Sequence, residues 1–461
     1  MFKAVVCVSV FTSNTKGEWT MKKRKWFKLA SLLLAAAVAG TGCQGQTGKE
    51  QEQKKEGSTV QIEFWAAPNP TQQAFWKKMA DRYMQEHKDV KIKVSPMPES
   101  PSSEAGIQSA IAAGNAPVIS ENISRGFAAQ LSDSRAIVPL DQFEGFDDLI
   151  AKRQMKSTIS TWKFADGHQY VLPIYSNAML FGWRIDILKE LGYNAPPKTY
   201  SEVLEVGKKL KEKYPNKFLW ARADLVKPTW WARWFDFFMI YNAASNGTHF
   251  IDGNKLSADR DAGVKALQFF ADLSKNQLVL TKETKDPFES GTSVMSDLGP
   301  WTFPYWAEKF PEMKFNEKYV LSMPPVPDGT DPSQAKTFAD TKGLVIYASA
   351  TKEQQQAAFD FVKWVYSDPQ NDLEWLKETN LPPARDDLST NEAFVSYFEQ
   401  NPQLKLYAEN IPNAIPPMDN AKMVELQELI GKEALNPVVK GEKTPEKAWD
   451  DMEKAIRGVL K

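Results

Sequence analysis

The 461-residue chain is nearly neutral, with 57 Lys or Arg against 58 Asp or Glu, and it has only two Cys, Cys7 and Cys43. Such a charge balance lacks the basic surface that nucleic-acid binding needs, so we expect no nucleic-acid partner. Two Cys close to the N-terminus leave no disulfide or cysteine metal site to hold the fold. The roughly 400 residues beyond residue 60 exceed what one hydrophobic core usually organises, so two lobes are expected.

Residues 21–43 have the layout of a secretory signal: basic side chains come first, then an apolar run, then small residues up to Cys43. The apolar run is too short for a stable membrane span. The small residues before Cys43 are similar to the processing box of bacterial lipoproteins, which usually has an aliphatic residue where this chain has Gly40. We therefore predict translation from Met21 and a lipidated Cys43, acylated for example by palmitate, that anchors the protein on the outer face of the cell membrane.

Residues 44–59 contain almost no apolar side chain. They cannot bury surface, so we expect a disordered tether between the anchor and the folded part. Removal of residues 1–42 takes away seven Lys or Arg and one acidic residue, which makes the remaining chain weakly acidic.

Strands and helices are predicted to alternate through the first part of the folded region. Residues Val60–Phe64 have apolar side chains at every second position, which predicts a strand, and Asn69 and Pro70 suit the cap and first position of a helix. The same patterns predict further elements: a strand from Val90 to Val94, a helix over residues 104–113 closed by Gly114, and a strand near Val118. This alternation indicates an α/β fold with a mostly parallel, doubly wound sheet.

Polar and aromatic residues follow the carboxyl ends of two of these strands, the edge at which open sheets of this kind bind ligands. Trp65 and Asn69 lie at one such end, and the stretch from Glu121 to Arg125 lies at another. Trp65 suits either a lid over the core or a ring that stacks on a ligand. Arg125 suits either a surface salt bridge or a ligand contact.

The rest of the chain continues the mixture of strands and helices. Two strands are predicted over Gln169–Ile174 and Met179–Trp183, joined through Tyr175, Ser176 and Asn177. Thr199–Glu202 forms a capping box ahead of a helix that Pro215 ends. Further helices are predicted over residues 261–273, 353–366 and 445–460, the last opening at Thr444.

The segment Trp230–Phe238 places six aromatic side chains in nine residues. On a single helix starting near Thr229 these rings fall within one arc of about 160°, which predicts the buried face of a core helix. We expect Phe235, Phe237 and Phe238 to be buried. Tryptophan is seldom fully buried and its indole N–H needs a partner, which suits the wall of a polar cleft.

Several kinds of catalytic chemistry have no signal in the chain. The three His residues, His87, His168 and His249, lie far apart without metal-ligand spacing, and no nucleophile elbow, phosphate-binding loop or dinucleotide fingerprint occurs. We therefore expect no metal, no cofactor and no catalytic residue. The chain has many acidic residues, so their number alone does not exclude a glycosidase that uses two carboxylates. Each Asp or Glu is, however, more typical of a solvated surface charge.

A series of segments, in this order and spacing, carries a family resemblance: IEFW, AAGNAP (112–117), DGHQYVLPI (166–174), LKELGYNAPPKTYSEV (188–203), SGTSVMSDLGPW (290–301), MPPVPDG (323–329), TKGLVIYAS and AAFDFVKWVYSDPQ (357–370). From about Val60 to Lys461 the chain resembles the extracellular solute-binding proteins of bacterial ABC importers, in the sugar-binding family that includes maltose- and multiple-sugar-binding proteins. Two positions depart from the family pattern: Val118 replaces an Asp, and Gly182–Trp183 replaces a Tyr-Asn pair, which suggests a different ligand.

The resemblance implies a periplasmic-binding-protein-like fold of two α/β lobes, each a sheet flanked by helices, with a ligand cleft between them. The chain would cross the hinge three times, near Tyr175–Ala178, Lys336–Thr341 and Pro383–Asp387. Residues 60–176 and 340–385 would form the N-terminal lobe, and residues 177–339 and 386–461 the C-terminal lobe.

The resemblance also implies a carbohydrate ligand, which aromatic rings stack against while polar side chains bind its hydroxyl groups. In relatives the Trp of a Gly-Pro-Trp segment lines the cleft. The predicted ligand-binding residues are Trp65, Asn69, Arg125, Tyr175, Asn177, Trp230, Trp231, Trp234 and Trp301. Several rings in a row favour an oligosaccharide. The expected partners are this sugar and the transmembrane subunits of an ABC permease, with the receptor a monomer.

Three alternatives stay open. A secreted carbohydrate-active hydrolase would cleave the sugar with two carboxylates placed across the cleft. A lipid-anchored adhesin or sensor would use the same cleft for signalling. A receptor of the same class could also bind a non-sugar solute such as a glycerophosphodiester.

Overall fold

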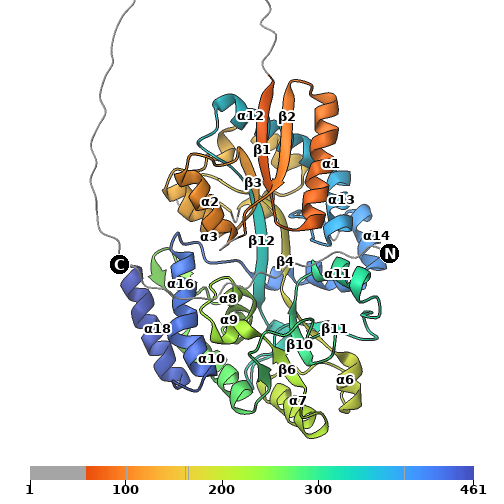
Figure 1. Ribbon diagram of the computed structural model, residues 1–461, viewed down its shortest axis with the longest axis vertical. Helices are drawn as coiled ribbons and strands as arrows, with labels where there is room; N and C mark the ends of the chain where they lie inside the picture. The colour runs from red at the N-terminus through yellow and green to blue at the C-terminus, as the bar shows by residue number, and fades with distance from the viewer. Residues whose placement is uncertain (1–58, 100–101, 161, 165, 389) are drawn as a thin grey trace, which may run out of the picture. The chain divides into compact units, whose positions relative to one another are not determined.

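The computed structural model describes residues 59–99, 102–160, 162–164, 166–388 and 390–461 (Figure 1). The predicted signal peptide, the predicted lipidation at Cys43 and nearly all of the predicted tether lie outside the described residues. Within the described residues, no helix is both long and apolar enough to cross a membrane.

The first of two large sheets has six strands in the order β13-β12-β3-β1-β2, with β4 also paired to β12. Its strands are β1 (Val60–Ala66), β2 (Val90–Pro96), β3 (Ile119–Ile123), β4 (Leu172–Ala178), β12 (Thr337–Ile346) and β13 (Ala414–Ile415). Strand β1 is parallel to β2 and β3, as predicted, but β12 is antiparallel to β3 and β4. Strand β12 is parallel to β13. The predicted parallel order thus holds for β1, β2 and β3, whereas the antiparallel pairings of β12 with β3 and β4 were not predicted.

The second sheet has five strands in the order β11-β5-β10-β6-β9. Its strands are β5 (Leu180–Trp183), β6 (Phe218–Ala221), β9 (Val279–Leu280), β10 (Ser293–Leu298) and β11 (Val320–Ser322), and a small hairpin pairs β7 (Ile251–Asp252) with β8 (Lys255–Leu256). Strand β6 is parallel to β9 and β10, whereas β5 is antiparallel to β10 and β11. Both sheets are thus mixed.

Helices cover both sheets (Figure 1). The α-helices are α1 (Pro70–Glu86), α2 (Ser103–Ala112), α3 (Arg125–Asp133), α4 (Phe146–Lys152), α5 (Lys156–Ser160), α6 (Ile185–Glu190), α7 (Tyr200–Lys213), α8 (Ala232–Phe235), α9 (Phe237–Ala244), α10 (Arg260–Lys275), α11 (Thr302–Lys309), α12 (Lys352–Tyr366), α13 (Pro369–Thr379), α14 (Glu392–Gln400), α15 (Pro402–Glu409), α16 (Met423–Leu429), α17 (Asn436–Val439) and α18 (Pro445–Val459). Short 3-10 segments are η1 (Leu140–Gln142), η2 (Ala223–Val226), η3 (Pro332–Gln334) and η4 (Ile411–Asn413), and η5 (Ile430–Leu435) is a π-helix.

The helix starts follow the local chemistry of the sequence. Asn69 caps α1, with Pro70 as the first helical residue, and its side chain accepts from the backbone N–H groups of Thr71 and Gln72. The predicted capping box of Thr199 and Glu202 opens α7 with both of its hydrogen bonds. These local predictions are confirmed because they depend only on neighbouring residues.

Two predictions about local structure are wrong. Tyr175, Ser176 and Asn177 do not join two strands but lie inside β4, because their backbone pairs with β12. The aromatic segment is not one helix: it breaks at Asp236, whose φ of −123° and ψ of −79° separate α8 from α9. Asp236 is fully buried and accepts from Arg233, a pairing that a helical wheel does not show.

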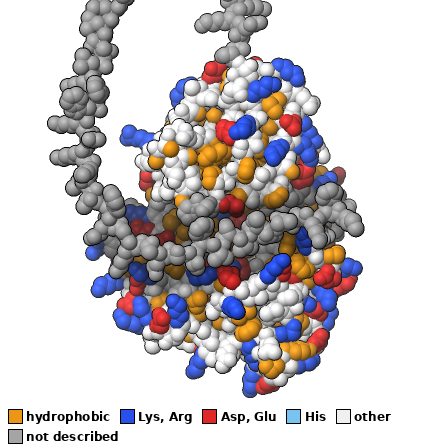
Figure 2. Space-filling model, viewed as in Figure 1, with side chains coloured by type: hydrophobic (Ala, Val, Ile, Leu, Met, Phe, Trp, Pro, Cys, Tyr) orange, Lys and Arg blue, Asp and Glu red, His pale blue; other side chains and the backbone are white. Residues whose placement is uncertain are grey.

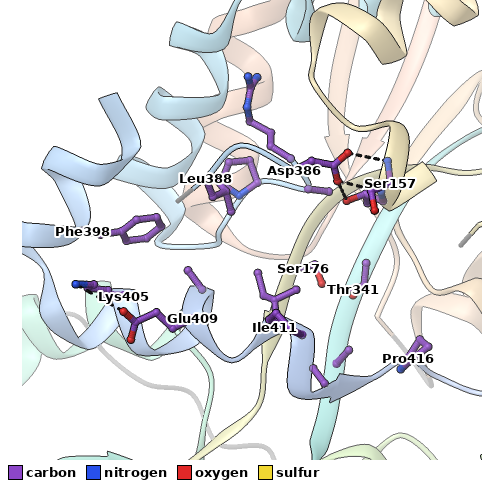
Figure 3. A pocket seen from close by; sticks show the side chains of 18 of the residues that line it. Ser157, Ser176, Thr341, Asp386, Leu388, Phe398, Lys405, Glu409, Ile411 and Pro416 are labelled. Carbon is purple, nitrogen blue, oxygen red and sulfur yellow. Dashed lines mark hydrogen bonds and ion pairs between the residues drawn. The ribbon is translucent and has the colours of Figure 1, made fainter. Parts of the chain in front are cut away.

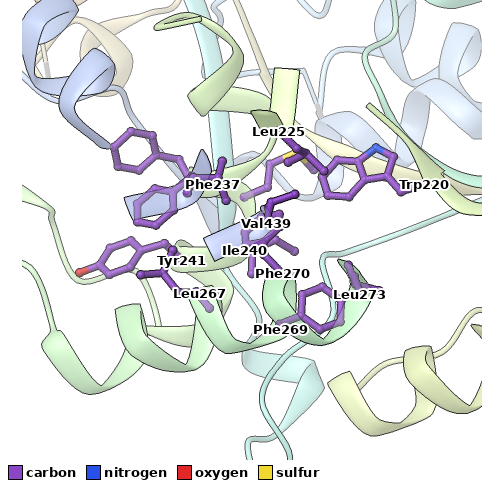
Figure 4. Packing of buried hydrophobic residues seen from close by; sticks show 14 of the residues in the cluster. Trp220, Leu225, Phe237, Ile240, Tyr241, Leu267, Phe269, Phe270, Leu273 and Val439 are labelled. Carbon is purple, nitrogen blue, oxygen red and sulfur yellow. The ribbon is translucent and has the colours of Figure 1, made fainter. Parts of the chain in front are cut away.

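Each sheet has its own hydrophobic core. The first core gathers side chains of β1 to β4, α1, α3 and α12. The second gathers side chains of β5, β6, α9, α10 and α18, and includes the buried Phe237 and Tyr241 (Figure 4). Phe237 and Phe238 are buried as predicted, whereas Phe235 keeps part of its surface exposed. A third cluster gathers side chains of β5, β10, α11, α13, α14 and α15. The expectation that one core does not organise the chain is therefore confirmed.

The three segments predicted as hinge crossings are hydrogen-bonded to one another. In β4 and β12, Asn177 pairs with Asp340 and Ser176 with Thr341. The N–H of Ser176 donates to the carbonyl of Pro382, at 3.1 Å, and Tyr175 and Pro383 form an isolated antiparallel bridge, which joins the third segment to β4. The chain therefore passes between the two sheets along neighbouring paths.

A buried ion cluster fixes the third of these segments to the first core. Asp372 in α13 accepts from Arg153 and Arg385, at 2.9 and 3.0 Å, and all three side chains are almost fully buried. Arg153 also donates to the carbonyl of Ile174 in β4, at 2.7 Å. The cluster holds α13, β4 and the segment that contains Arg385 in one arrangement.

Replacing Asp372 by Asn should destabilise the protein by about 3 to 5 kcal/mol, because two buried guanidinium groups lose their charged partner. Urea unfolding followed by circular dichroism measures this loss. The matched control is Asp450→Asn, which breaks the exposed pair with Arg260 and should cost less than about 1 kcal/mol. Similar costs for both variants would contradict the assignment.

Candidate functional site

The paired strands β4 and β12 present two different faces at the junction of the sheets. Residues opposite each other in an antiparallel pair share a face, and neighbours along a strand alternate. Tyr175 and Asn177 therefore lie on the same face as Lys342 and Asp340, which we call the polar face. Ser176, Ala339 and Thr341 lie on the opposite face.

The polar face carries a charge pair that is nearly excluded from water. The ammonium of Lys342 lies 3.6 Å from the carboxylate of Asp340, and the exposed fractions of these side chains are 10% and 4%. The hydroxyl of Tyr175 donates to Asp340, at 3.4 Å. Burial raises the pKa of Asp340, while Lys342 and Tyr175 oppose this shift.

Aromatic side chains of the second lobe pack against this face. The ring centre of Trp234 lies 4.0 Å from the ammonium of Lys342, a cation–π contact, and its ring stacks on Phe338 of β12 at 5.9 Å. Trp230 meets Trp234 edge to face, at 5.1 Å. These contacts already occupy much of the Trp234 ring.

Trp301 lies where the two cores approach each other. It directly precedes α11 and packs against both hydrophobic cores, with its ring 6.0 Å from that of Phe235. Trp301 is only partly buried. It therefore offers ring surface at the junction, which suits stacking on an apolar ligand face.

A second charge network lies at the carboxyl ends of β6 and β10. Arg222 donates to Asp297 at 2.7 Å, and the indole N–H of Trp220 donates to the same carboxylate at 3.2 Å. Arg222 also contacts Asp236, which Arg233 holds at 2.9 Å. Burial raises the pKa of Asp297, and Arg222 opposes the shift. This network fixes α8, and with it Trp234, to the second sheet.

On the first sheet, the predicted residues Trp65 and Asn69 flank the turn after β1. Trp65 is partly buried at the edge of the first core, and Asn69 uses its side-chain oxygen to cap α1. Between them, the N–H of Ala67 donates to the buried carboxyl of Glu121 in β3, at 2.7 Å. Burial raises the pKa of Glu121 to about 7. Glu121 thus holds the turn that presents Trp65.

The opposite face of β4 and β12 forms the floor of a cavity of about 820 Å³. Figure 3 shows Ser176 and Thr341 side by side on this floor, and their hydroxyl oxygens lie 2.9 Å apart. Phe398 and Ile411 contribute apolar wall from α14 and η4. Of the nine predicted ligand-binding residues, only Arg125 lines this cavity.

The structure thus brings some predicted residues together and leaves others apart. Tyr175, Trp230 and Trp234 lie along the chain of contacts around Lys342, and Trp301 adjoins it through Phe235. Asn177 lies on the polar face and is fully buried; among the described residues its side-chain oxygen has no hydrogen-bond partner. Trp231 stands apart, with 42% of its surface exposed. Arg125 forms an ion pair with Asp419, at 2.8 Å.

The predicted site residues do not include the charged residues of this site, among them Arg222, Asp297, Asp340 and Lys342. A usable signal existed for the last two, because charges two residues apart interrupt an apolar strand and so share one face. For Arg222 and Asp297 the sequence shows only a charged residue near the end of a strand, which is a weaker indication of a ligand site.

Both positions that depart from the family pattern lie in the cores. Val118 is buried, and Trp183 is fully buried with its indole N–H donating to Ser322, at 3.1 Å. Trp183 therefore contributes to packing.

In the described part of the chain, no group of His, Cys, Asp and Glu is arranged to hold a metal ion.

Two α/β lobes, joined by neighbouring segments with aromatic and paired charged side chains at the junction, define a two-lobe binding protein. The sequence model of bacterial extracellular solute-binding proteins matches residues 78–405. The chain belongs to this family, whose members include the solute-binding proteins of ABC importers.

Solved structures and curated relatives agree with this assignment. The chain is 58% identical to the Listeria monocytogenes protein lmo0859, with a TM-score of 0.77 over 87% of this chain and 100% of that one. It shares its fold with the cyclic alpha-maltosyl-1,6-maltose binding protein of Arthrobacter globiformis, at 20% identity and a TM-score of 0.72 over 87% and 99% of the chains. It is 24% identical to the sn-glycerol-3-phosphate-binding periplasmic protein UgpB of Pectobacterium atrosepticum, over 94% of this chain and 95% of that one.

The buried Glu121 should make stability depend on pH. Its pKa is about 7 in the folded protein against an ordinary value of 4.5, so between these values the folded protein binds a proton that the unfolded chain has released. The free energy of unfolding should therefore fall as pH rises from about 4.5 to about 7. Glu121→Gln should remove this loss, which is at most about 3 kcal/mol.

Chemical unfolding at a series of pH values between 4.5 and 8 measures this difference. Gln keeps an acceptor for the N–H of Ala67, whereas Glu121→Ala removes it and should lower stability at every pH. Because neither variant has a carboxyl at position 121, the stability of both should lack the fall with rising pH that the parent protein shows. A difference between Glu121→Gln and the parent that stays constant across this range would contradict a buried, titrating carboxyl.

Proposed function

We propose that the ligand is a carbohydrate, specifically an oligosaccharide, bound at the junction of the lobes by the polar face and the aromatic side chains around it. Trp301 at the junction provides ring surface that is not fully buried, and Trp65 does so at the edge of the first core. Trp231, which stands apart from these contacts, is exposed. Asn177, Asp340 and Lys342 provide donors and acceptors for hydroxyl groups. Rings beside polar groups match a sugar, which has apolar C–H faces and a rim of hydroxyl groups.

The observation that carries the choice of a neutral ligand is the charge balance of the site. Each basic side chain there has a carboxylate within hydrogen-bond or ion-pair distance: Lys342 with Asp340, Arg222 with Asp297, and Arg233 with Asp236. Basic side chains bind a phosphate through strong charge-assisted hydrogen bonds, and the basic side chains here are already paired with carboxylates. Over the visible face of Figure 2, basic and acidic side chains are likewise interspersed.

A glycerophosphodiester is the second candidate, because a structural relative, UgpB of Mycobacterium tuberculosis, was solved in complex with glycerophosphocholine, and a curated relative binds the related sn-glycerol 3-phosphate. The pairing of every basic side chain of the site with a carboxylate disfavours this phosphate-containing ligand. A structural relative that binds a cyclic maltosyl sugar supports a carbohydrate ligand. The relatives named for sn-glycerol 3-phosphate and for the maltosyl sugar are both binding proteins. We propose likewise that no bond of the ligand is broken here, since Asp297 and Asp340 are each already held by a basic side chain.

In this proposal the receptor is a monomer that closes around its ligand and delivers it to an ABC permease, with Cys43 as its lipid anchor. The first lobe comprises residues 60–176 and 340–385, and the second comprises residues 177–339 and 386–461. Closure excludes water from the ligand, and the closed state is favoured to the extent that it binds the ligand more tightly.

Intrinsic Trp fluorescence of the protein from Glu56 onward, the start of the compact unit, tests the ligand class. Titration with malto-, xylo-, arabino-, galacto- and manno-oligosaccharides should give a saturable change with one series, and product analysis should recover that sugar intact. Glycerophosphocholine should give none. Binding of glycerophosphocholine alone would favour the second candidate, and cleaved sugar would show an enzyme.

Trp301→Ala should weaken binding of the active sugar by about tenfold, because a stacking surface at the junction is lost. Trp301→Phe keeps a ring and should lose less. The control is Trp364→Phe, which changes a partly buried ring of the first lobe beside Tyr83. Equal affinity of the Trp301→Ala variant and the parent protein, measured where both are folded, would remove Trp301 from the site.

A further inference from the structure

The cavity of about 820 Å³ takes no part in the proposed sugar site. It lies on the side of β4 and β12 that Ser176, Ala339 and Thr341 face, opposite Asn177 and Lys342. Its volume falls within the about 300 to 1,000 Å³ that is typical of small-molecule sites. A molecule in this cavity shares its two floor strands with the polar face but lies on the other side of them.

Much of the cavity wall is apolar and comes from the helices that follow the third connecting segment. Val395 and Phe398 line it from α14, Ala408 from α15 and Ile411 from η4 (Figure 3). Trp162 adds an aromatic ring that belongs to the first core. A wall of this kind binds a ligand by removing apolar surface from water.

The charged side chains at the cavity are balanced in number and mostly paired. Three are basic and three are acidic: Arg125, Arg385 and Lys405, and Asp386, Glu399 and Glu409. Each basic side chain has a carboxylate within 3.6 Å: Asp419 for Arg125, Asp372 for Arg385 and Glu409 for Lys405. Asp386 accepts from two backbone N–H groups of α5, and Glu399 is exposed to water. The cavity therefore suits an uncharged molecule.

The floor of the cavity offers a place for a hydrogen bond. The hydroxyl oxygens of Ser176 and Thr341 lie 2.9 Å apart; Thr341 is buried and Ser176 is partly buried. In such a pair one hydroxyl donates to the other, so this bond leaves the O–H of the second hydroxyl unused, together with acceptor capacity on both. A polar group that faces this pair gains a hydrogen bond in an otherwise apolar surrounding.

We propose that this cavity is a second binding site, for a neutral and mainly apolar small molecule with one uncharged hydrogen-bonding group directed at Ser176 and Thr341. The apolar wall supplies the affinity, and the hydroxyl pair orients the molecule. This site goes beyond the proposed function, in which a sugar occupies the polar face. Because the two sites lie on opposite faces of β4 and β12, both ligands bind at the same time.

N-Phenyl-1-naphthylamine, a neutral dye whose fluorescence rises in an apolar environment, tests the site on the protein from Glu56 onward. Titration should give a saturable rise in fluorescence. 1-Naphthol should displace the dye. 1-Naphthoate has the same ring system with a carboxylate and should compete at least about tenfold less well, because a buried charge without a partner is costly.

Two substitutions that fill the cavity locate the bound dye. Ala408→Trp in α15 and Val395→Trp in α14 add a ring at the wall from different helices. Each should weaken dye binding at least about tenfold, a loss of about 1.4 kcal/mol or more. The matched control is Ala151→Trp, which adds the same ring at an exposed residue of α4 and should leave binding unchanged. Circular dichroism identifies the variants that are folded.

A double substitution tests the hydroxyl pair with little change in cavity volume. Ser176→Ala with Thr341→Val removes both hydroxyl groups, so that neither is left without its partner. The affinity for 1-naphthol should fall by about fivefold, as the loss of one neutral hydrogen bond implies. The affinity for naphthalene, which has no hydrogen-bonding group, should not fall.

Several results would overturn this second site. They are a dye signal that does not saturate, dye binding that the folded filling variants leave unchanged, and competition by 1-naphthoate as strong as that by 1-naphthol. Displacement of the dye by the sugar that the protein binds would also overturn it, because the cavity would then be part of the sugar site. A sugar titration without any response would leave the dye measurements intact, so this proposal and the proposed function fail separately.

Discussion

The pairing of β4 with β12 is the constraint on which the rest of the structure depends. These strands carry the chain from one core to the other, and all ten residues of β12 are buried. A buried backbone must satisfy its N–H and C=O groups, and the antiparallel pairing does so while the third segment bonds to the edge of β4. Along both paired strands, successive side chains point to opposite faces in register. This single pairing therefore creates the polar face on one side and the floor of the cavity on the other.

Buried charged side chains at the junction of the two sheets require partners, and these partners determine which elements pack around the junction. Lys342 would not be stable in this setting alone, so Asp340 and the ring of Trp234 compensate its desolvation. That contact draws α8 against β12. At the other end of α8, Asp236 needs Arg222 and Arg233, and their network breaks the aromatic segment into two helices. The position of the aromatic side chains thus follows from buried electrostatics more than from helical propensity.

This dependence explains which features the sequence could reveal. The cap at Asn69, the capping box at Thr199 and the strand of Val60 to Phe64 follow from neighbouring residues, and the structure has them all. The break at Asp236 and the continuation of β4 through Tyr175 depend on residues far away in the sequence, and local patterns gave the wrong answer there. For the site, the aromatic segment pointed to Trp234 and the family resemblance to Trp301. The pair of Asp340 and Lys342 was missed, although both lie in β12 two residues apart and therefore on one face.

The paired charges at the junction of the lobes suit a neutral solute. A receptor must release its ligand to a permease, so the closed state can exceed the open state only modestly in stability. A phosphate facing unpaired buried cations would bind through charge-assisted bonds that are individually strong. Here every cation of the polar face and its neighbouring network already has a carboxylate, so a ligand gains neutral hydrogen bonds and ring contacts, each of which is weak. Many weak contacts spread over several rings favour a long neutral ligand, whose affinity grows with its number of units.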